Sequence, residues 1–177
     1  MKVRDITSVI EAYAPLSLQE DFDNSGLNVG NPESEVSGIL LCVDVTEAVL
    51  DEAIALGANL IVSHHPLLFH PLRRVIGADA SQRIVARCLI SGISLYAAHT
   101  NLDNAPGGMN FRLGTILGLE NMTFLRPRNS TVIPSGSGVV GNLPSPRPTL
   151  ELLREIKEQL RCGVIRYSAP CRPQVSR

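Results

Sequence analysis

Three short apolar runs that alternate with two helical patterns constrain the fold of this chain more than any other feature. The runs cover residues 38–45, 60–62 and 93–98. Between them, Thr46 begins one amphipathic pattern that Gly57 ends, and residues 81–90 form the second. Because parallel strands need long crossover connections, usually helical, this alternation predicts an α/β fold with a largely parallel sheet flanked by helices.

Weaker patterns lie on either side of this alternation. Apolar residues recur at helical spacing over residues 3–13, and residues 110–117 show a similar pattern. The stretch 21–30 is polar and punctuated by glycine. We therefore expect an Asx-type turn there, which carries Leu27 and Val29 into the core.

The sequence changes character after Leu119, where proline, glycine and serine become frequent. Residues 131–134 and 139–140 are short β-prone pieces. Thr149 is expected to cap a helix that continues to about Leu160.

The last residues of the chain carry little apolar pattern. We interpret residues 164–167 as a further strand and residues 168–177, which contain Pro170 and Pro173, as a disordered tail. With 44% hydrophobic residues, the part before the tail is long enough for one core. We therefore expect a single α/β domain over residues 1–167.

Charge and composition exclude several classes of function. The 16 basic and 17 acidic residues leave a net charge of −1, and the sequence has no tryptophan, which disfavours nucleic-acid and membrane-surface binding. No apolar run reaches the roughly 18 residues that span a bilayer. The N-terminus does not resemble a signal peptide, so we expect a cytoplasmic protein. The cysteines form no C-x-x-C pair and are expected to be buried thiols.

Polar side chains follow each of the three central strands. Asp44 ends the first, His64 and His65 end the second, and His99 with Asp103 ends the third. Ligands collect at the carboxyl ends of strands in open α/β sheets, so these groups are expected to lie close together. Imidazole and carboxylate together suit Zn, Fe, Mn or Ni. The sequence therefore predicts a divalent metal site at this edge.

The adjacent pair His64–His65 indicates more than one ion. Successive side chains of a strand point to opposite faces, so adjacent histidines do not naturally chelate one ion. At a strand end that is already turning before Pro66, the two rings can serve two neighbouring ions. Two such ions, roughly 3.5–4 Å apart, activate a water for attack on a phosphoryl, amide or ring carbon.

Each of these residues also has a structural interpretation. A single histidine at a strand end is commonly a hydrogen-bonding core residue. Asp44 can cap the following helix together with Thr46, and Asp103 can belong to a plain turn. We interpret His70, between Phe69 and Pro71, as structural.

One glycine-rich segment imitates a cofactor motif, because residues 136–141 match G-x-G-x-x-G. A dinucleotide site needs a helix that opens at this loop. Residues 142–146 contain two prolines instead, which disfavour such a helix. We therefore exclude an NAD or FAD site.

Four motifs occur together in the order in which one protein family carries them. They are Asp23-Asn24-Ser25-Gly26-Leu27-Asn28-Val29-Gly30, Ser63-His64-His65-Pro66-Leu67, His99-Thr100-Asn101-Leu102-Asp103 and Gly136-Ser137-Gly138-Val139-Val140-Gly141. Through them the chain closely resembles the Nif-three-like dinuclear metal centre family, whose bacterial members are called GTP cyclohydrolase I type 2 homologues. The resemblance implies an α/β fold and a toroidal homohexamer whose metal sites face an internal cavity.

The resemblance also implies roles for individual residues. His64, His65 and Asp103 would be ligands of two divalent ions, with His99 close to the site. Family members add a histidine and a bridging glutamate from a C-terminal segment, whereas no histidine follows His99 here. We expect a truncation or frameshift after Tyr167. We also expect the resulting protein to be less stable than full-length family members, or to associate with other copies differently.

Two classes of function remain open at this point. In the first, the protein is a metal-dependent hydrolase of a nucleotide-like or other small cyclic or phosphorylated substrate, with His99 as the catalytic general base. In the second, it is a metal-binding oligomeric scaffold or regulator that acts through partners without catalysis. A third possibility is a relic without activity.

Overall fold

The computed structural model describes residues 1–129, 133–169 and 172–177. Contacts within the chain divide it into two compact units, Met1–Ala105 and Pro106–Arg177. The sequence led us to expect one domain over residues 1–167, whereas these contacts separate the α/β part from the later part, which is rich in glycine and proline. Each unit has its own strand pairing.

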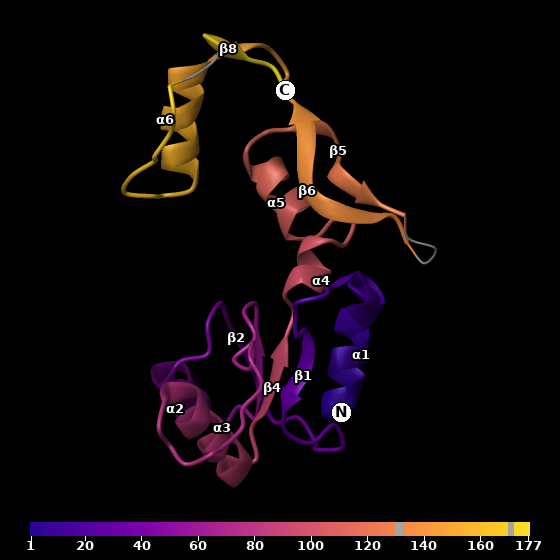
Figure 1. Ribbon diagram of the computed structural model, residues 1–177, viewed down its shortest axis with the longest axis vertical. Coiled ribbons are helices and arrows are strands. Elements are labelled where there is room, and N and C mark those ends of the chain that lie inside the picture. The colour runs from indigo at the N-terminus through magenta and orange to yellow at the C-terminus, as the bar shows by residue number, and fades with distance from the viewer. Residues whose placement is uncertain (130–132, 170–171) are drawn as a thin grey trace. The chain divides into compact units, whose positions relative to one another are not determined.

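The first unit is built on a four-stranded sheet with the order β1-β4-β3-β2. Figure 1 labels β1, β4 and β2 of this sheet. Its strands are β1 (Gly26–Val29), β2 (Ile39–Cys42), β3 (Leu60–Ser63) and β4 (Ser94–Ala97). β2, β3 and β4 are parallel, and β1 pairs antiparallel with β4. The predicted, largely parallel sheet is confirmed. Its three parallel strands end at one edge, as the site requires.

β1 lies where the sequence predicted a turn. Gly26 is the first residue of β1 and Gly30 directly follows it. Their φ angles of 109° and 112° favour glycine, and glycines at such positions are also typical of turns. A Cβ at Gly30 would lie 2.2 Å from Ser94 Oγ, so this glycine also permits the close approach to β4. Pairing with a distant strand therefore decides the structure here. Leu27 and Val29 do pack into the core, as predicted.

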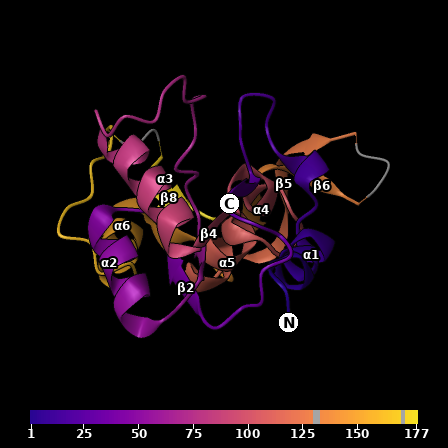
Figure 2. The same cartoon turned by 90° about the horizontal axis from the view of Figure 1, so that it is seen from below.

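Helices cover both faces of this sheet (Figures 1 and 2). α2 (Glu47–Leu56) and α3 (Ala80–Ser91) pack on Ile61 and Leu95, and α1 (Val3–Tyr13) packs on Leu60 and Tyr96. Because neighbouring residues of a strand point to opposite faces, the two sets of contacts lie on opposite sides of the sheet. The sheet is thus the central layer of the first unit.

The helix ends follow the sequence signals closely. Thr46 Oγ1 accepts a hydrogen bond from Val49 N at 3.2 Å, and Gly57 ends α2 in the left-handed conformation, as predicted. Asp79 caps α3 by accepting from Gln82 N at 2.9 Å, so this helix begins slightly earlier than expected. Such a side-chain cap stabilises a helix by about 1 kcal/mol.

Two short helices, η1 (Leu16–Leu18) and α4 (Thr100–Asp103), lie near the carboxyl edge of the sheet. The buried side chain of Asn101 donates from Nδ2 to the Ala14 carbonyl at 2.7 Å. Asn104 Nδ2 donates in the same way to Leu18 O at 2.9 Å. These bonds fix the segment that follows β4.

The second unit contains a long hairpin of β5 (Glu120–Arg128) and β6 (Ser135–Asn142), against which α5 (Met109–Ile116) packs. The glycine-rich residues 136–141 lie inside β6 and do not form a loop that opens a helix. A Cβ at Gly136 would lie 2.8 Å from Phe124 Cβ, so packing explains this glycine. The predicted β-prone residues 139–140 lie in β6, while residues 131 and 132 lie outside the described residues.

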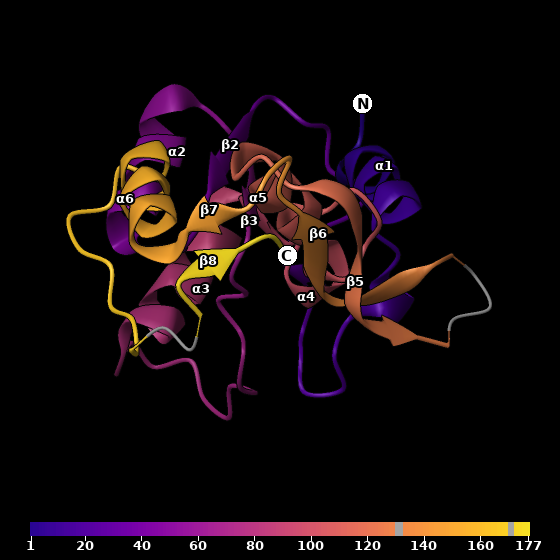
Figure 3. The ribbon, with the colours of Figure 1, turned by 90° about the horizontal axis from the view of Figure 1, so that it is seen from above.

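The remaining elements are β7 (Arg147–Pro148), α6 (Thr149–Gln159) and β8 (Gln174–Val175), shown in Figure 3. Thr149 is the first residue of α6 rather than its cap, and its Oγ1 donates to Arg172 O at 2.8 Å. The predicted strand over residues 164–167 is wrong, because these residues have no strand partner in the described structure. β8 pairs with β7, within the stretch where we expected a disordered tail. None of the described helices is both long and apolar enough to span a membrane.

The buried thiol of Cys88 gives a direct test of the packing of α3. Its side chain has no exposed surface, and burial raises the pKa of the thiol to about 11. Since the thiolate is the reactive form, about one part in a thousand is reactive at pH 8. We expect iodoacetamide to label Cys88 far more slowly than the half-buried Cys162, as followed by peptide mass spectrometry. Comparable labelling rates in the native protein would contradict the packing.

Candidate metal centre

The turn after β3 presents His64 and His65. The backbone N–H groups of both histidines continue the parallel pairing, His64 to Cys42 O at 3.1 Å and His65 to Val43 O at 2.9 Å. Ser63 Oγ donates to the carbonyl of His65 at 2.8 Å and so closes the turn. The turn overrides the alternation of side chains that a regular strand would impose.

His99 and Asp103 come from the end of β4. His99 is the residue directly before α4, and the N–H of Asp103 donates to the His99 carbonyl at 3.1 Å. One turn of helix therefore separates the two residues, which places them on the same side of α4. Asp103 Oδ1 lies 3.9 Å from His64 Nε2.

The three imidazoles form a triangle at the carboxyl edge of the sheet. The ring centroids lie 5.0 Å apart for His64 and His65, 5.3 Å for His64 and His99, and 5.5 Å for His65 and His99. One ligand atom from each residue lies within 4.8 Å of the other two. The structure thus brings together the predicted histidines, with Asp103 beside them.

Each of the three rings is oriented through its Nδ1 atom. His64 Nδ1 lies 2.9 Å from the Ala98 carbonyl, His65 Nδ1 lies 2.8 Å from Asp44 Oδ1, and His99 Nδ1 lies 2.7 Å from Asp23 Oδ1. A carbonyl or carboxylate oxygen only accepts, so each Nδ1 carries the proton and donates. In the neutral form of such a ring the proton lies on Nδ1 and Nε2 is unprotonated, which is the arrangement that histidine ligands of metals use.

Asp23 is the functional residue that sequence reasoning missed. Its side chain has 0% exposure, and besides His99 it accepts from the backbone N–H of Thr100 at 3.0 Å, from the Thr100 hydroxyl and from Ser25 Oγ at 2.8 Å. Burial by itself raises the pKa of this carboxyl. The hydrogen bonds that it accepts, led by that from His99, outweigh burial and lower the pKa to about 2.

The outcome for the other acidic and imidazole groups differs from residue to residue. Thr46 alone supplies the side-chain cap of α2, and Asp44 bonds to His65 instead of capping the helix. His70 is not among the clustered histidines, and its ring lies 5.2 Å from that of Phe69. The only sequence signal for Asp23 was its place in the family motif of residues 23–30. We interpreted the local structure of this segment as a turn.

Solvent reaches the cluster from one side. The His65 side chain is 49% exposed, whereas those of His64 and His99 are 23% and 16% exposed. Two rings of the cluster are therefore mostly buried, and the ring of His65 is accessible to solvent. Three imidazoles whose ligand atoms lie this close together could hold one divalent ion.

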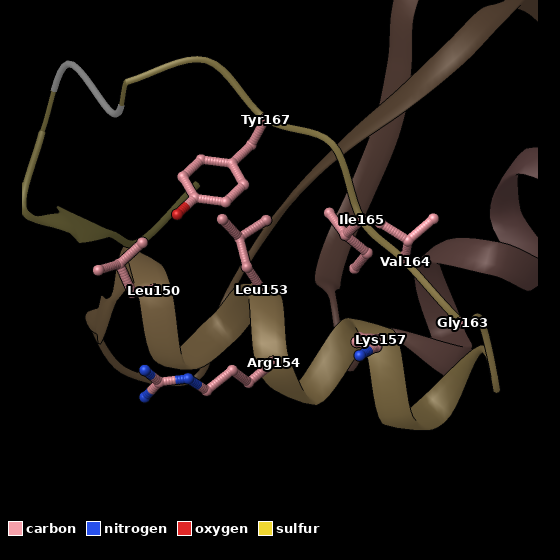
Figure 4. A pocket seen from close by; sticks show the side chains of 8 residues that line it. All are labelled: Leu150, Leu153, Arg154, Lys157, Gly163, Val164, Ile165 and Tyr167. Carbon is pink, nitrogen blue, oxygen red and sulfur yellow. The ribbon is translucent and has the colours of Figure 1, made fainter.

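A separate pocket of about 270 Å³ lies in the second unit between α6 and the irregular segment that follows it. Figure 4 shows its lining side chains, among them Leu153, Arg154, Lys157 and Tyr167. The lining includes no histidine, cysteine or carboxylate. This pocket therefore offers none of the ligands that a divalent metal requires.

The fold and the cluster together define an α/β protein with imidazole and carboxylate groups gathered at the carboxyl edge of a mainly parallel sheet. The chain belongs to the Duf34/NIF3 (NGG1p interacting factor 3) family, whose sequence model matches residues 1–177. The resemblance inferred from the motifs is thereby confirmed.

Two curated relatives are each named GTP cyclohydrolase 1 type 2 homolog. The protein of Clostridium acetobutylicum is 36% identical over 167 residues, which cover 94% of this chain and 62% of the relative. That of Clostridium perfringens is 39% identical over 168 residues, which cover 95% of this chain and 64% of the relative. The chain thus spans less than two thirds of the length of these relatives.

Among solved structures, Staphylococcus aureus protein SA1388 superposes with a TM-score of 0.89 at 26% identity. The match covers 99% of this chain and 70% of that protein. The described architecture is therefore that of an experimentally determined relative, and the predicted fold class is confirmed.

The buried bond from His99 to Asp23 gives a test of how the rings are oriented. We expect Asp23→Asn to weaken Zn²⁺ binding by about 10- to 100-fold, because the amide no longer holds His99 with a charged acceptor. Competition with a chromophoric chelator measures the affinity. Asp51→Asn, at an exposed carboxylate that pairs with Arg87, is the matched control. Equal affinities of Asp23→Asn and the unaltered chain would contradict the assignment.

Proposed function

We propose that His64, His65 and His99, with Asp103 beside them, bind divalent metal ions, and that the protein is a metal-dependent hydrolase. The observation that carries this proposal is the shared orientation of the three rings. Each Nδ1 is occupied by an oxygen acceptor, and each Nε2 is left to bind. Core histidines that only satisfy hydrogen bonds have no reason to converge in this way.

The ligands that the chain offers support the number of ions that we propose. Three imidazoles whose ligand atoms lie within 4.8 Å of one another suit one ion, and Asp103 offers a carboxylate for a neighbouring one. We propose two ions, of Zn, Fe, Mn or Ni, as the sequence motifs imply. The His99 ring lies 5.3 and 5.5 Å from the other two, and one of its ligand atoms lies within 4.8 Å of theirs, so we propose that it is a ligand rather than the general base.

A divalent ion bound here supplies Lewis-acid chemistry, since it polarises a phosphoryl or carbonyl oxygen and lowers the pKa of water. The residues of the chain supply orientation and charge. Asp23 and Asp44 hold the rings of His99 and His65 through the Nδ1 hydrogen bonds. Exposure of His65 leaves the centre open to a small substrate.

The names of the curated relatives support a substrate class. Both are called GTP cyclohydrolase 1 type 2 homolog, so we propose a nucleotide-like or other small cyclic or phosphorylated substrate. We propose a cytoplasmic location, in keeping with the small-molecule substrate.

We further propose a homo-oligomer, a hexamer by resemblance. The edge strand β2 supports assembly, because the apolar side chains of Ile39 and Leu41 in this strand, and of Val43 directly after it, are exposed.

A second proposal is a metal-binding scaffold that acts through protein partners. The family description supports it, since NGG1p interacting factor 3 is a name for an interacting protein. The two proposals share the metal centre and differ in turnover. A metal-dependent hydrolysis that His65→Ala abolishes favours the enzyme, whereas a partner interaction without any turnover favours the scaffold.

Metal content tests the centre itself. We expect protein purified without chelators or a histidine tag to contain divalent metal by plasma mass spectrometry, because the rings are already oriented. His64→Ala removes one of three clustered ligands and is expected to lower the metal content to near zero. His70→Ala, which alters the one histidine outside the cluster, is expected to leave it unchanged. Equal losses in both variants would contradict the site.

A further inference from the structure

Two phenylalanine rings stand beside the metal centre. The ring of Phe69 lies 6.2 Å from that of His99, at an interplanar angle of 84°. Phe22 lies 6.3 Å from Phe69 at 58°. The aromatic surface therefore continues outward from the imidazole cluster through two phenyl rings that belong to different loops.

Anchored neighbours hold these rings in place. Phe22 directly precedes Asp23, whose fully buried carboxylate bonds to His99. Phe69 directly follows Leu68, and the Leu68 carbonyl accepts a hydrogen bond from Asn24 Nδ2 at 2.7 Å. The two loops are thus tied to each other and to the cluster, so the backbone that carries each ring is held near the site.

Neither ring is buried by the fold. Phe22 is 66% exposed and Phe69 is 38% exposed. The aromatic pair of the second unit, Phe111 and Phe124, has a centroid separation of 5.0 Å and is partly buried on both sides. Exposed apolar rings that are held beside a polar site form a typical surface for the flat, apolar part of a ligand.

We infer that Phe69, supported by Phe22, stacks on a planar heteroaromatic ring of the substrate, and that the substrate class is a nucleobase-containing phosphate. The inference rests on the proposed function, because the phosphate end of such a ligand binds at the metal centre. The heteroaromatic ring of the ligand then lies against Phe69 and Phe22. Phe69 determines specificity without taking part in the chemical step. Stacking of this kind tolerates different bases because every base has a π face.

The test compares two ligands that differ in the ring. GMP and ribose 5-phosphate share the sugar phosphate, and calorimetry measures the dissociation constant of each on the Zn²⁺-loaded chain. We expect Phe69→Leu, which keeps an apolar side chain, to weaken the binding of GMP by about 5- to 150-fold. This is the range for the loss of one base–aromatic stacking contact. Phe69→Tyr keeps the ring and is expected to retain GMP affinity. Phe22→Leu is expected to have a smaller effect in the same direction.

The controls separate this inference from the metal proposal. Phe111→Leu alters the aromatic pair of the second unit and is expected to leave both affinities unchanged. Metal content, measured on each sample, stays at the level of the unaltered chain in every variant. Loss of metal in the unaltered chain would overturn the proposed function. Three results obtained with metal bound would overturn the inferred stacking on Phe69. They are an absence of GMP binding, an unchanged GMP affinity in Phe69→Leu, and an equal loss of affinity for ribose 5-phosphate.

Discussion

The buried carboxylate of Asp23 is the group on which the arrangement of the site depends. It joins the loop before β1 to the start of α4, because it accepts hydrogen bonds from His99, Thr100 and Ser25 together. A carboxylate without surface exposure is stable only when its oxygens are fully hydrogen-bonded, and here the donors lower its pKa to about 2. The residue therefore has a double role. It fixes the chain at the carboxyl edge of the sheet, and it selects which nitrogen of His99 is left for a ligand.

Two further acceptors repeat the same arrangement at the neighbouring rings. The Ala98 carbonyl and the Asp44 carboxylate occupy Nδ1 of His64 and His65. One acceptor is backbone at the end of β4, and the other is a side chain at the end of β2. The parallel sheet thus supplies both the histidines and the groups that orient them, since its strands end at one edge. The phenyl rings of Phe22 and Phe69 extend this ordered region outward without being part of the core.

The central fold was predictable because its signals are local. Thr46 and Gly57 mark the ends of α2, and apolar runs of strand length mark β2, β3 and β4. β1 was missed because its glycines resemble a turn, and only the pairing with β4 makes it a strand. The same holds at α6, where Thr149 bonds to Arg172 across the β7–β8 pair and does not cap the helix.

The positions of the candidate site residues at the strand ends were predictable, whereas the groups that orient the rings were not. The sequence placed His64, His65, His99 and Asp103 at strand ends, which is where the structure has them. The sequence predicted a strand end that is already turning before Pro66, and the turn closed by Ser63 brings the rings of the two adjacent histidines 5.0 Å from each other. Asp23 could not be assigned, because it reaches the cluster from 76 residues away along the chain.

The tautomers of the three histidines test the account most directly. Nitrogen-15 NMR correlations of the metal-free protein at pH 8 distinguish protonated from unprotonated ring nitrogens. We predict that His64, His65 and His99 carry the proton on Nδ1, and that Zn²⁺ shifts their Nε2 resonances while leaving those of His70 in place. Protonation at Nε2 in these residues, or Nε2 resonances that Zn²⁺ does not move, would contradict it.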